Sequence, residues 1–105
     1  MSTPIRHIVI FHIRPEATSE QIQVFSGHFR SLKDKIPGII AFEHGENNSP
    51  EGMNRGLNHV YILTFQDVAA RDAYLPHPEH RKFIELNAQM GLTDEVFVID
   101  YAPEP

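Results

Sequence analysis

The sequence predicts an α+β domain whose elements follow the order β-α-β-β-α-β. Four short segments are rich in β-branched and aromatic residues, and two longer segments carry apolar residues at helical steps of three and four. This order is typical of a ferredoxin-like fold, with a four-stranded antiparallel sheet and the helices on one face. The 105 residues contain no linker or repeat, so residues 1–105 are expected to form a single domain.

The first strand and the first helix are expected in the N-terminal third. Residues 5–13 (IRHIVIFHI) are too short for a typical helix, and both alternating sets of side chains contain apolar residues, which indicates a strand covered on both faces. Thr18 and Gln21 have the spacing of a capping box. One apolar stripe follows, formed by Ile22, Phe25, Phe29, Leu32 and Ile36. Residues 36–38 (IPG) end this helix.

Two further strands, at 39–45 and 59–65, flank a loop at 46–58 that contains turn formers and no periodic pattern. The strand at 59–65 is again apolar on both faces. Two helical segments cover only one face of a sheet, so the other face would expose Ile8, Ile10, Val60 and Ile62. Since a large exposed apolar surface marks an interaction site, we predict a homodimer in which two such sheets pack face to face.

The C-terminal third is expected to contain a broken helix and a last strand. Asp67 can cap a short helix that Pro76 must end, and Pro78 suits the first turn of another helix. Gly91 can stop the second helix, and residues 95–101 (EVFVIDY) form the fourth strand. The apolar face of the second helix is expected to consist of Phe83, Ile84, Leu86 and Met90.

Charge and composition exclude several classes of function. The net charge is -5 and the nine Lys and Arg are scattered, which argues against a nucleic-acid groove. No apolar stretch is long enough to cross a membrane, and the N-terminus lacks the pattern of a signal peptide. Cysteine is absent, which excludes a disulfide framework and a thiolate metal site. We therefore expect a soluble cytoplasmic domain with no nucleic-acid or membrane partner.

The whole chain resembles the stress-responsive α/β-barrel (Dabb) family, whose members are dimeric α/β barrels. The segments that carry the resemblance are, in order, IRHIVIFHI, IPGI, EHGENNSPEG, LNHVYILTF, YLPHPEH and VIDY. The family includes plant proteins induced by stress, polyketide cyclases and bacterial proteins of unknown role.

The resemblance also implies a site. In the plant polyketide cyclases of the family a tyrosine and a histidine at this spacing carry the chemistry, and they match Tyr74 and His80. The strand histidines that flank the pocket match His7 and His59. The implied apolar lining consists of Val9, Phe11, Phe25, Phe29, Tyr61 and Phe83. This chain departs from those cyclases at Phe29, where they have a tyrosine, so the identity of the substrate stays open.

The chemistry of the two side chains agrees with such a role. A neutral imidazole, with an ordinary pKa of ~6.5, can take and return a proton near neutral pH. A phenol held beside it can donate a hydrogen bond to a developing oxyanion. Purely structural roles are the alternative, with Tyr74 in the core and His80 in solvent. His77 is expected to cap the helix that Pro78 opens.

The remaining histidines are not expected to form a metal site. His7 and His59 lie near the starts of strands that run in opposite directions, which places them toward opposite ends of the sheet. His12 is expected to face the interior of the dimer, and His28 and His44 to lie on the surface.

Two functions follow as hypotheses. The first is cofactor-free acid–base catalysis, of the cyclase, lyase or isomerase type, on a small apolar or aromatic carbonyl compound, with His80 as the base and Tyr74 as the donor. The alternative is a non-enzymatic, stress-associated assembly or ligand-binding protein that uses the same pocket without turnover.

Overall fold

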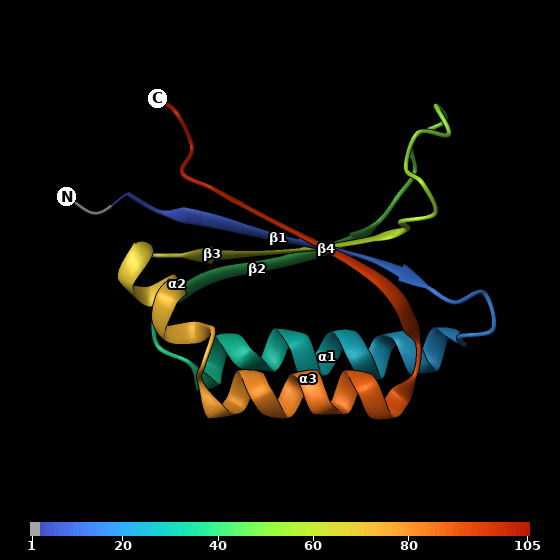
Figure 1. Ribbon diagram of the computed structural model, residues 1–105, viewed down its shortest axis with the longest axis horizontal. Coiled ribbons are helices and arrows are strands. Elements are labelled where there is room, and N and C mark those ends of the chain that lie inside the picture. The colour runs from blue at the N-terminus through green and yellow to red at the C-terminus, as the bar shows by residue number, and fades with distance from the viewer. Residues whose placement is uncertain (1–2) are drawn as a thin grey trace.

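A four-stranded antiparallel sheet carries three helices on one of its faces in the computed structural model, which describes residues 3–105 (Figure 1). The elements are β1 (Ile5–Ile13), α1 (Ser19–Lys35), β2 (Ile39–Glu46), β3 (His59–Phe65), α2 (Val68–Tyr74), α3 (Pro78–Met90) and β4 (Thr93–Tyr101). The strand order is β2-β3-β1-β4. The ferredoxin-like α+β fold is therefore confirmed, although β2 ends one residue later and β4 begins two residues earlier than the sequence predicts.

The first helix begins and ends where local signals place it. The hydroxyl of Thr18 accepts from the backbone N–H of Gln21 at 3.1 Å, and the Gln21 side chain accepts from the N–H of Thr18 at 2.9 Å. This is the predicted capping box. After the helix, Gly38 turns the chain with a φ of 95°, and a Cβ on it would lie 2.5 Å from the Cβ of Ala70. Only glycine fits this approach between the α1–β2 turn and α2.

The break between α2 and α3 also follows from short-range chemistry. Asp67 caps α2, and Pro78 is the first residue of α3, where its missing N–H costs no hydrogen bond. His77 is the N-cap of α3, and its Nδ1 accepts from the N–H of Glu79 at 3.1 Å. Gly91, with a φ of 64°, ends α3. These caps confirm the predicted kink and the predicted role of His77.

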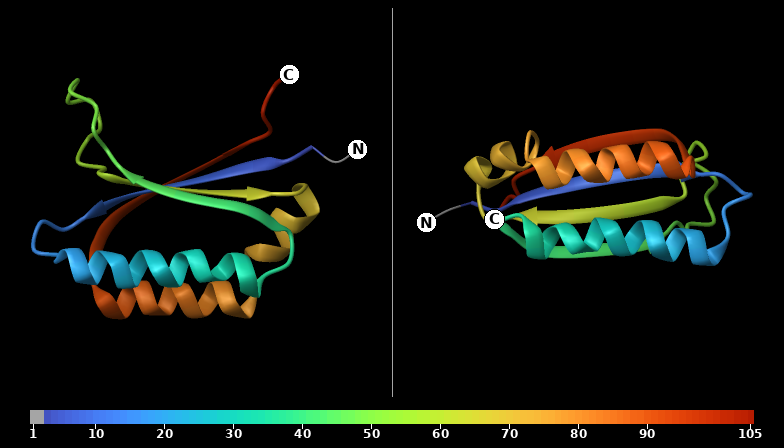
Figure 2. Two further views of the ribbon diagram at one scale, coloured as in Figure 1. Left: turned by 180° about the vertical axis from the view of Figure 1, so that it is seen from behind. Right: turned by 90° about the horizontal axis from the view of Figure 1, so that it is seen from below.

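The hydrophobic core fills the layer between the sheet and the helices. Seen from the helix side, α1 lies along β2 and α3 lies along β4 (Figure 2). The odd-numbered residues of β1 are buried against the helices, and the even-numbered residues are half-buried on the other face. The largest fully buried side chains are Tyr61, Tyr74, Phe25, Phe29, Phe65, Ile13, Ile36 and Leu63. On α3 only Phe83 is buried, so the predicted apolar face of this helix is narrower than expected.

No helix formed by residues 3–105 lies on the opposite face of the sheet, which we call the open face. In the antiparallel register Ile8 pairs with Ile62 and Ile10 pairs with Val60. Two large side chains of β4, Phe97 and Ile99, extend this apolar surface at 50% and 55% exposure. The loop at 46–58 rises on this side of the sheet (Figure 1). Within the described residues, no helix has the length and the apolar character that a membrane span requires.

Candidate active site

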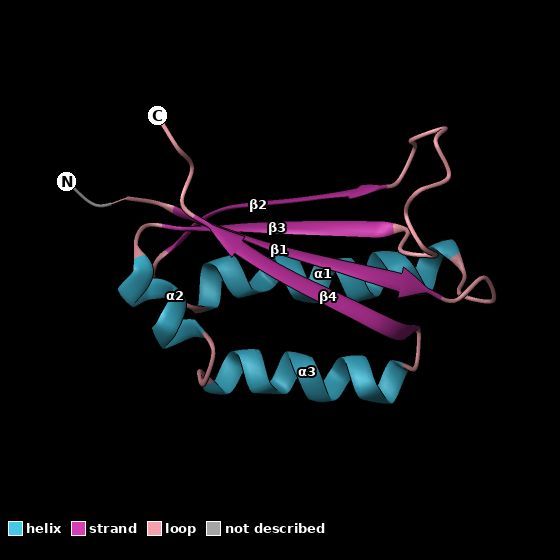
Figure 3. Cartoon of the chain, turned by 45° about the horizontal axis from the view of Figure 1, so that its top comes forward, coloured by secondary structure: helices cyan, strands magenta, loops and turns pink. Residues whose placement is uncertain are grey.

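A cavity of about 310 Å³ lies between β1 and β4 on the sheet side and α2 and α3 on the helix side. Two of the elements that line it, β4 and α3, run side by side in the fold (Figure 3). The lining is mainly apolar and includes four polar side chains that can bond to a ligand: His7, Tyr74, His80 and Asn87. The apolar lining residues are Val9, Phe11, Phe29, Leu75, Phe83, Ile84, Val96 and Val98. An apolar cavity with a few convergent polar groups is the usual form of a small-molecule site.

The break between α2 and α3 brings Tyr74 and His80 together. Tyr74 is the last residue of α2 and His80 lies in the first turn of α3, so the intervening turn stacks their rings with centroids 4.1 Å apart. The Nδ1 of His80 lies 2.9 Å from the carbonyl oxygen of Leu75. Because a carbonyl can only accept, this nitrogen carries the proton, and in the neutral ring Nε2 keeps a free lone pair. His80 therefore has the tautomer of a general base.

The surroundings keep His80 in the form that can accept a proton. Partial burial is the largest cause that lowers the pKa of His80, and the nearby His7 lowers this pKa further. The hydrogen bond to the Leu75 carbonyl acts in the opposite direction and does not outweigh burial. Since the ordinary pKa of histidine is ~6.5, His80 is mostly neutral at pH 7.

Tyr74 is a buried hydrogen-bond donor whose surroundings differ from those of His80. Its side chain is 0% exposed, and its hydroxyl makes no hydrogen bond to the described residues. Burial raises the pKa of Tyr74 far above its ordinary value, so the phenol keeps its proton. Its ring packs against the rings of Phe65 and His7, with centroids 5.0 Å and 5.7 Å away. An unsatisfied buried hydroxyl is costly, and because Tyr74 lines the cavity, a molecule bound there can serve as its partner.

His7 is held by a carboxylate and an arginine that the sequence analysis missed. The buried His7 on β1 lies opposite Asp100 on β4, and its Nδ1 is 2.7 Å from Asp100 Oδ1. The other carboxylate oxygen accepts from Arg71 Nη1 at 2.8 Å. The carboxylate thereby fixes the orientation of the imidazole, and the arginine orients the carboxylate. Asp100 directly follows the apolar run Val96–Ile99 in β4, which was the one available signal.

Five of the other residues implied by the resemblance line this cavity. They are His7, Val9, Phe11, Phe29 and Phe83. The other three, Phe25, His59 and Tyr61, do not line it. His59 pairs with Phe11, four residues along β1 from His7, so the two histidines lie at different ends of the sheet as predicted. Phe25 packs behind the lining, with its ring centroid 5.5 Å from that of Phe11.

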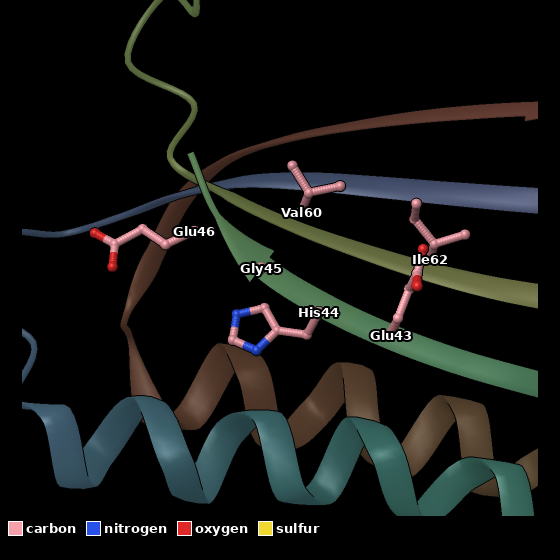
Figure 4. A pocket seen from close by; sticks show the side chains of 6 residues that line it. All are labelled: Glu43, His44, Gly45, Glu46, Val60 and Ile62. Carbon is pink, nitrogen blue, oxygen red and sulfur yellow. The ribbon is translucent and has the colours of Figure 1, made fainter. Parts of the chain in front are cut away.

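His59 belongs to a second cluster near the edge of the sheet. Its Nδ1 lies 3.1 Å from Nε2 of His44, and the His44 ring stacks on Tyr61 at 4.1 Å. The Tyr61 hydroxyl is 2.7 Å from the hydroxyl of Ser26. Burial lowers the pKa of both histidines. The prediction that His44 is a surface residue is wrong, because its ring points from β2 toward the helices (Figure 4).

The other histidines have simpler surroundings. His28 is exposed on α1, as predicted. His12 lies on the open face and its Nδ1 contacts Asp94. Within residues 3–105, no three His, Cys, Asp or Glu side chains are grouped so that they could hold a metal ion. The absence of a bound metal stays a prediction.

Comparison with known proteins identifies the family to which the chain belongs. The family model described as "Stress responsive A/B Barrel Domain" (Dabb) matches residues 5–103. The chain belongs to the Dabb family. Over 100 residues it is 29% identical to the stress-response A/B barrel domain-containing protein HS1 of Arabidopsis thaliana, covering 95% of this chain and 90% of that protein. Over 99 residues it is 22% identical to olivetolic acid cyclase of Cannabis sativa, covering 94% of this chain and 96% of that protein.

Solved structures of similar proteins share the fold. The crystal structure of At3g17210 from Arabidopsis thaliana matches with a TM-score of 0.89 and 28% identity over 96% of each chain. Hydroxynitrile lyase from Passiflora edulis matches with a TM-score of 0.85 and 21% identity, over 99% of this chain and 96% of that one. A dimeric ferredoxin-like protein of unknown function from Jannaschia sp. CCS1 matches with a TM-score of 0.76 and 24% identity, over 95% and 99% of the two chains.

Proposed function

We propose that this Dabb protein catalyses cofactor-free proton transfer on a small, largely apolar carbonyl compound. The observation that carries the proposal is the pair formed by Tyr74 and His80 in an apolar cavity. One member is a buried phenol whose hydroxyl makes no hydrogen bond to the described residues, and the other is an imidazole with Nε2 free to accept a proton. A donor and a base with these properties are what a carbonyl compound needs for enolisation.

In the proposed step, Nε2 of His80 takes a proton from the carbon next to the substrate carbonyl. The electron pair of that C–H bond forms the new C=C bond, and the carbonyl π electrons move onto oxygen. The hydroxyl of Tyr74 donates a hydrogen bond to this developing oxyanion, and the low polarity of the walls strengthens the interaction. The imidazolium of His80 then returns the proton. An enolate formed in this way can close a ring or expel a leaving group, which are cyclase and lyase reactions.

His7 completes the polar end of the cavity. The contact of its Nδ1 with Asp100 fixes the ring, so the opposite nitrogen is positioned to exchange a second proton or to bond to the substrate. Two similar proteins support this class of reaction by their names, one a cyclase and one a lyase. The proposal does not extend to the substrates of those proteins, because Phe29 lines the cavity of this chain where the resemblance implies a tyrosine in the cyclases.

Proton exchange tests the proposal without knowledge of the natural substrate. A straight-chain ten-carbon methyl ketone would be incubated with the protein in D₂O, and loss of the protons next to the carbonyl would be followed by NMR. We expect the wild-type protein to accelerate exchange and His80→Ala to lose roughly 10²-fold or more of that acceleration. His77→Ala is the matched control, since it removes a histidine on the same turn that does not line the cavity. Binding of the ketone without exchange would favour the alternative of a ligand-binding protein.

We also propose that the protein forms a homodimer through the open face. The chain has a solvent-accessible surface of 6813 Å², which is larger than the roughly 6000 Å² expected for a compact monomer of its mass. It measures 44 × 32 × 18 Å, so it is a thin two-layer slab with one apolar side uncovered. A second copy offers a surface of the same shape and chemistry, and a two-fold axis would close the two sheets into one barrel. Similar structures described as dimeric support this choice of partner.

A further inference from the structure

The cavity has a second polar group at the end away from His80. On α3, His80 and Asn87 both line it, and a separation of seven residues places them about two helical turns apart on the same face. At the rise of an α-helix this corresponds to about 10 Å along the axis. Between them Phe83 and Ile84 supply apolar walls. The cavity is therefore polar at both ends along this helix and apolar in the middle.

On the sheet side, formed by β1 and β4, the lining of the cavity also changes from polar to apolar in the direction away from His80. On β1 the residues that line the cavity run from His7 through Val9 to Phe11. Their neighbours on β4 include Val98, which pairs with Val9, and Val96, which pairs with Phe11. Both strands thus lead from the end of the cavity that His7 lines into its apolar part. A ligand that fills the cavity must be elongated, with its reacting carbonyl at the His7 end.

Asn87 is oriented so that it can donate at the far end. The hydroxyl of Thr93, the first residue of β4, donates to Oδ1 of Asn87 at 2.9 Å. The backbone carbonyl of Asn87 accepts from the N–H of Gly91 at 3.1 Å, which fixes the last turn of the helix. The structure records no hydrogen bond from Asn87 Nδ2 to residues 3–105. With the amide oxygen engaged, the free group of this side chain is a donor.

We propose that Asn87 determines substrate specificity, and that the substrate is an elongated carbonyl compound with a neutral hydrogen-bond acceptor at its far end. A hydroxyl or carbonyl oxygen suits the Nδ2 donor. A carboxylate suits it less well, because none of the described residues that line the cavity is Lys or Arg and so none could form a charge-assisted pair with it. This inference rests on the function proposed above, since it takes the His7 end of the cavity as the place of the reacting carbonyl.

The test compares two ligands that differ only at the far end. They are the straight-chain ten-carbon methyl ketone and the same ketone with a terminal hydroxyl group, and their dissociation constants would be measured by calorimetry. We expect wild-type protein to prefer the hydroxylated ketone by roughly 2- to 10-fold, the range of one net hydrogen bond. Asn87→Leu should abolish this preference, and Thr93→Val should reduce it by freeing the amide to rotate. Gln89→Leu, the same class of change on the exposed side of α3, should keep it.

Each outcome bears on the proposal. Equal affinities in the wild-type protein, or an unchanged preference in Asn87→Leu, would overturn the role of Asn87 while leaving proton exchange at the other end intact. A preference that depends on Asn87, without any exchange of ketone protons, would support the role of Asn87 in selecting a ligand and would overturn the catalytic proposal. If neither ketone binds, both are wrong. Circular dichroism spectra that match the wild type would exclude misfolding of the variants as the cause.

Discussion

Replacing Tyr74 with phenylalanine should make the protein more stable and less active. The hydroxyl of Tyr74 is buried and has no partner among the described residues, and such a group costs about 1–3 kcal/mol. Phenylalanine keeps the ring, so the stacking on His80 at 4.1 Å and the contact with Phe65 at 5.0 Å remain. We expect a gain in the free energy of unfolding of about 1 kcal/mol, which in a domain of this size raises Tm by about 4–8 °C.

The rate should change in the opposite direction. If Tyr74 donates to the oxyanion, Tyr74→Phe should slow ketone proton exchange by roughly 10²-fold while the affinity for the ketone changes little. The assay combines thermal unfolding at equal protein concentration with exchange followed by NMR. Tyr61→Phe is the control for stability: its hydroxyl is 2.7 Å from that of Ser26, so its removal leaves a buried group unpaired and should destabilise the protein. A lower Tm in Tyr74→Phe, or an unchanged exchange rate, would refute the reasoning.

Three further predictions concern assembly, a cap and pH. Ile10→Asp or Ile62→Asp should give a monomer or insoluble protein in sizing with light scattering; a wild-type chain that runs as a monomer at micromolar concentration would contradict the dimer. His77→Ala should lower the free energy of unfolding by about 0.5–2 kcal/mol through loss of the α3 cap, with exchange activity kept; an inactive, stable variant would show that His77 has a chemical role. Burial lowers the pKa of His44 and His59, so below pH 6.5 the unfolded chain binds more protons than the folded chain. The free energy of unfolding should therefore fall as the pH drops through and below that value. Replacing both histidines should flatten this pH profile, measured by urea titration.

Much of the fold could be predicted because its signals are local. The capping box at Thr18, the glycine at 38 and the proline at 78 each act within a few residues, and each begins or ends a helix where expected. The stacking of Tyr74 on His80 follows from the same short-range chemistry, since one turn of chain joins the two residues. For this reason the two residues proposed as donor and base could be suggested from the sequence with the help of the family resemblance.

The parts that could not be predicted depend on strand register. Asp100 reaches His7 only because β4 pairs with β1 in one particular alignment, which no local pattern encodes. On β2 the register shifts between Ile39 and Ala41, so simple alternation from Ile39 assigns His44 to the wrong face. Asn87 has an ordinary helical sequence context, and its place in the cavity becomes visible only when α3 packs beside β4.

The pH dependence of ketone proton exchange tests the central claim most directly. If neutral His80 is the base, the rate should rise with pH as His80 loses its proton, with a midpoint below 6.5, because burial lowers the pKa of this histidine. The rise should disappear in His80→Ala and persist in His77→Ala. Exchange in His80→Ala that keeps the wild-type rate and profile would show that another group removes the proton, and it would contradict the assignment of His80 as the base.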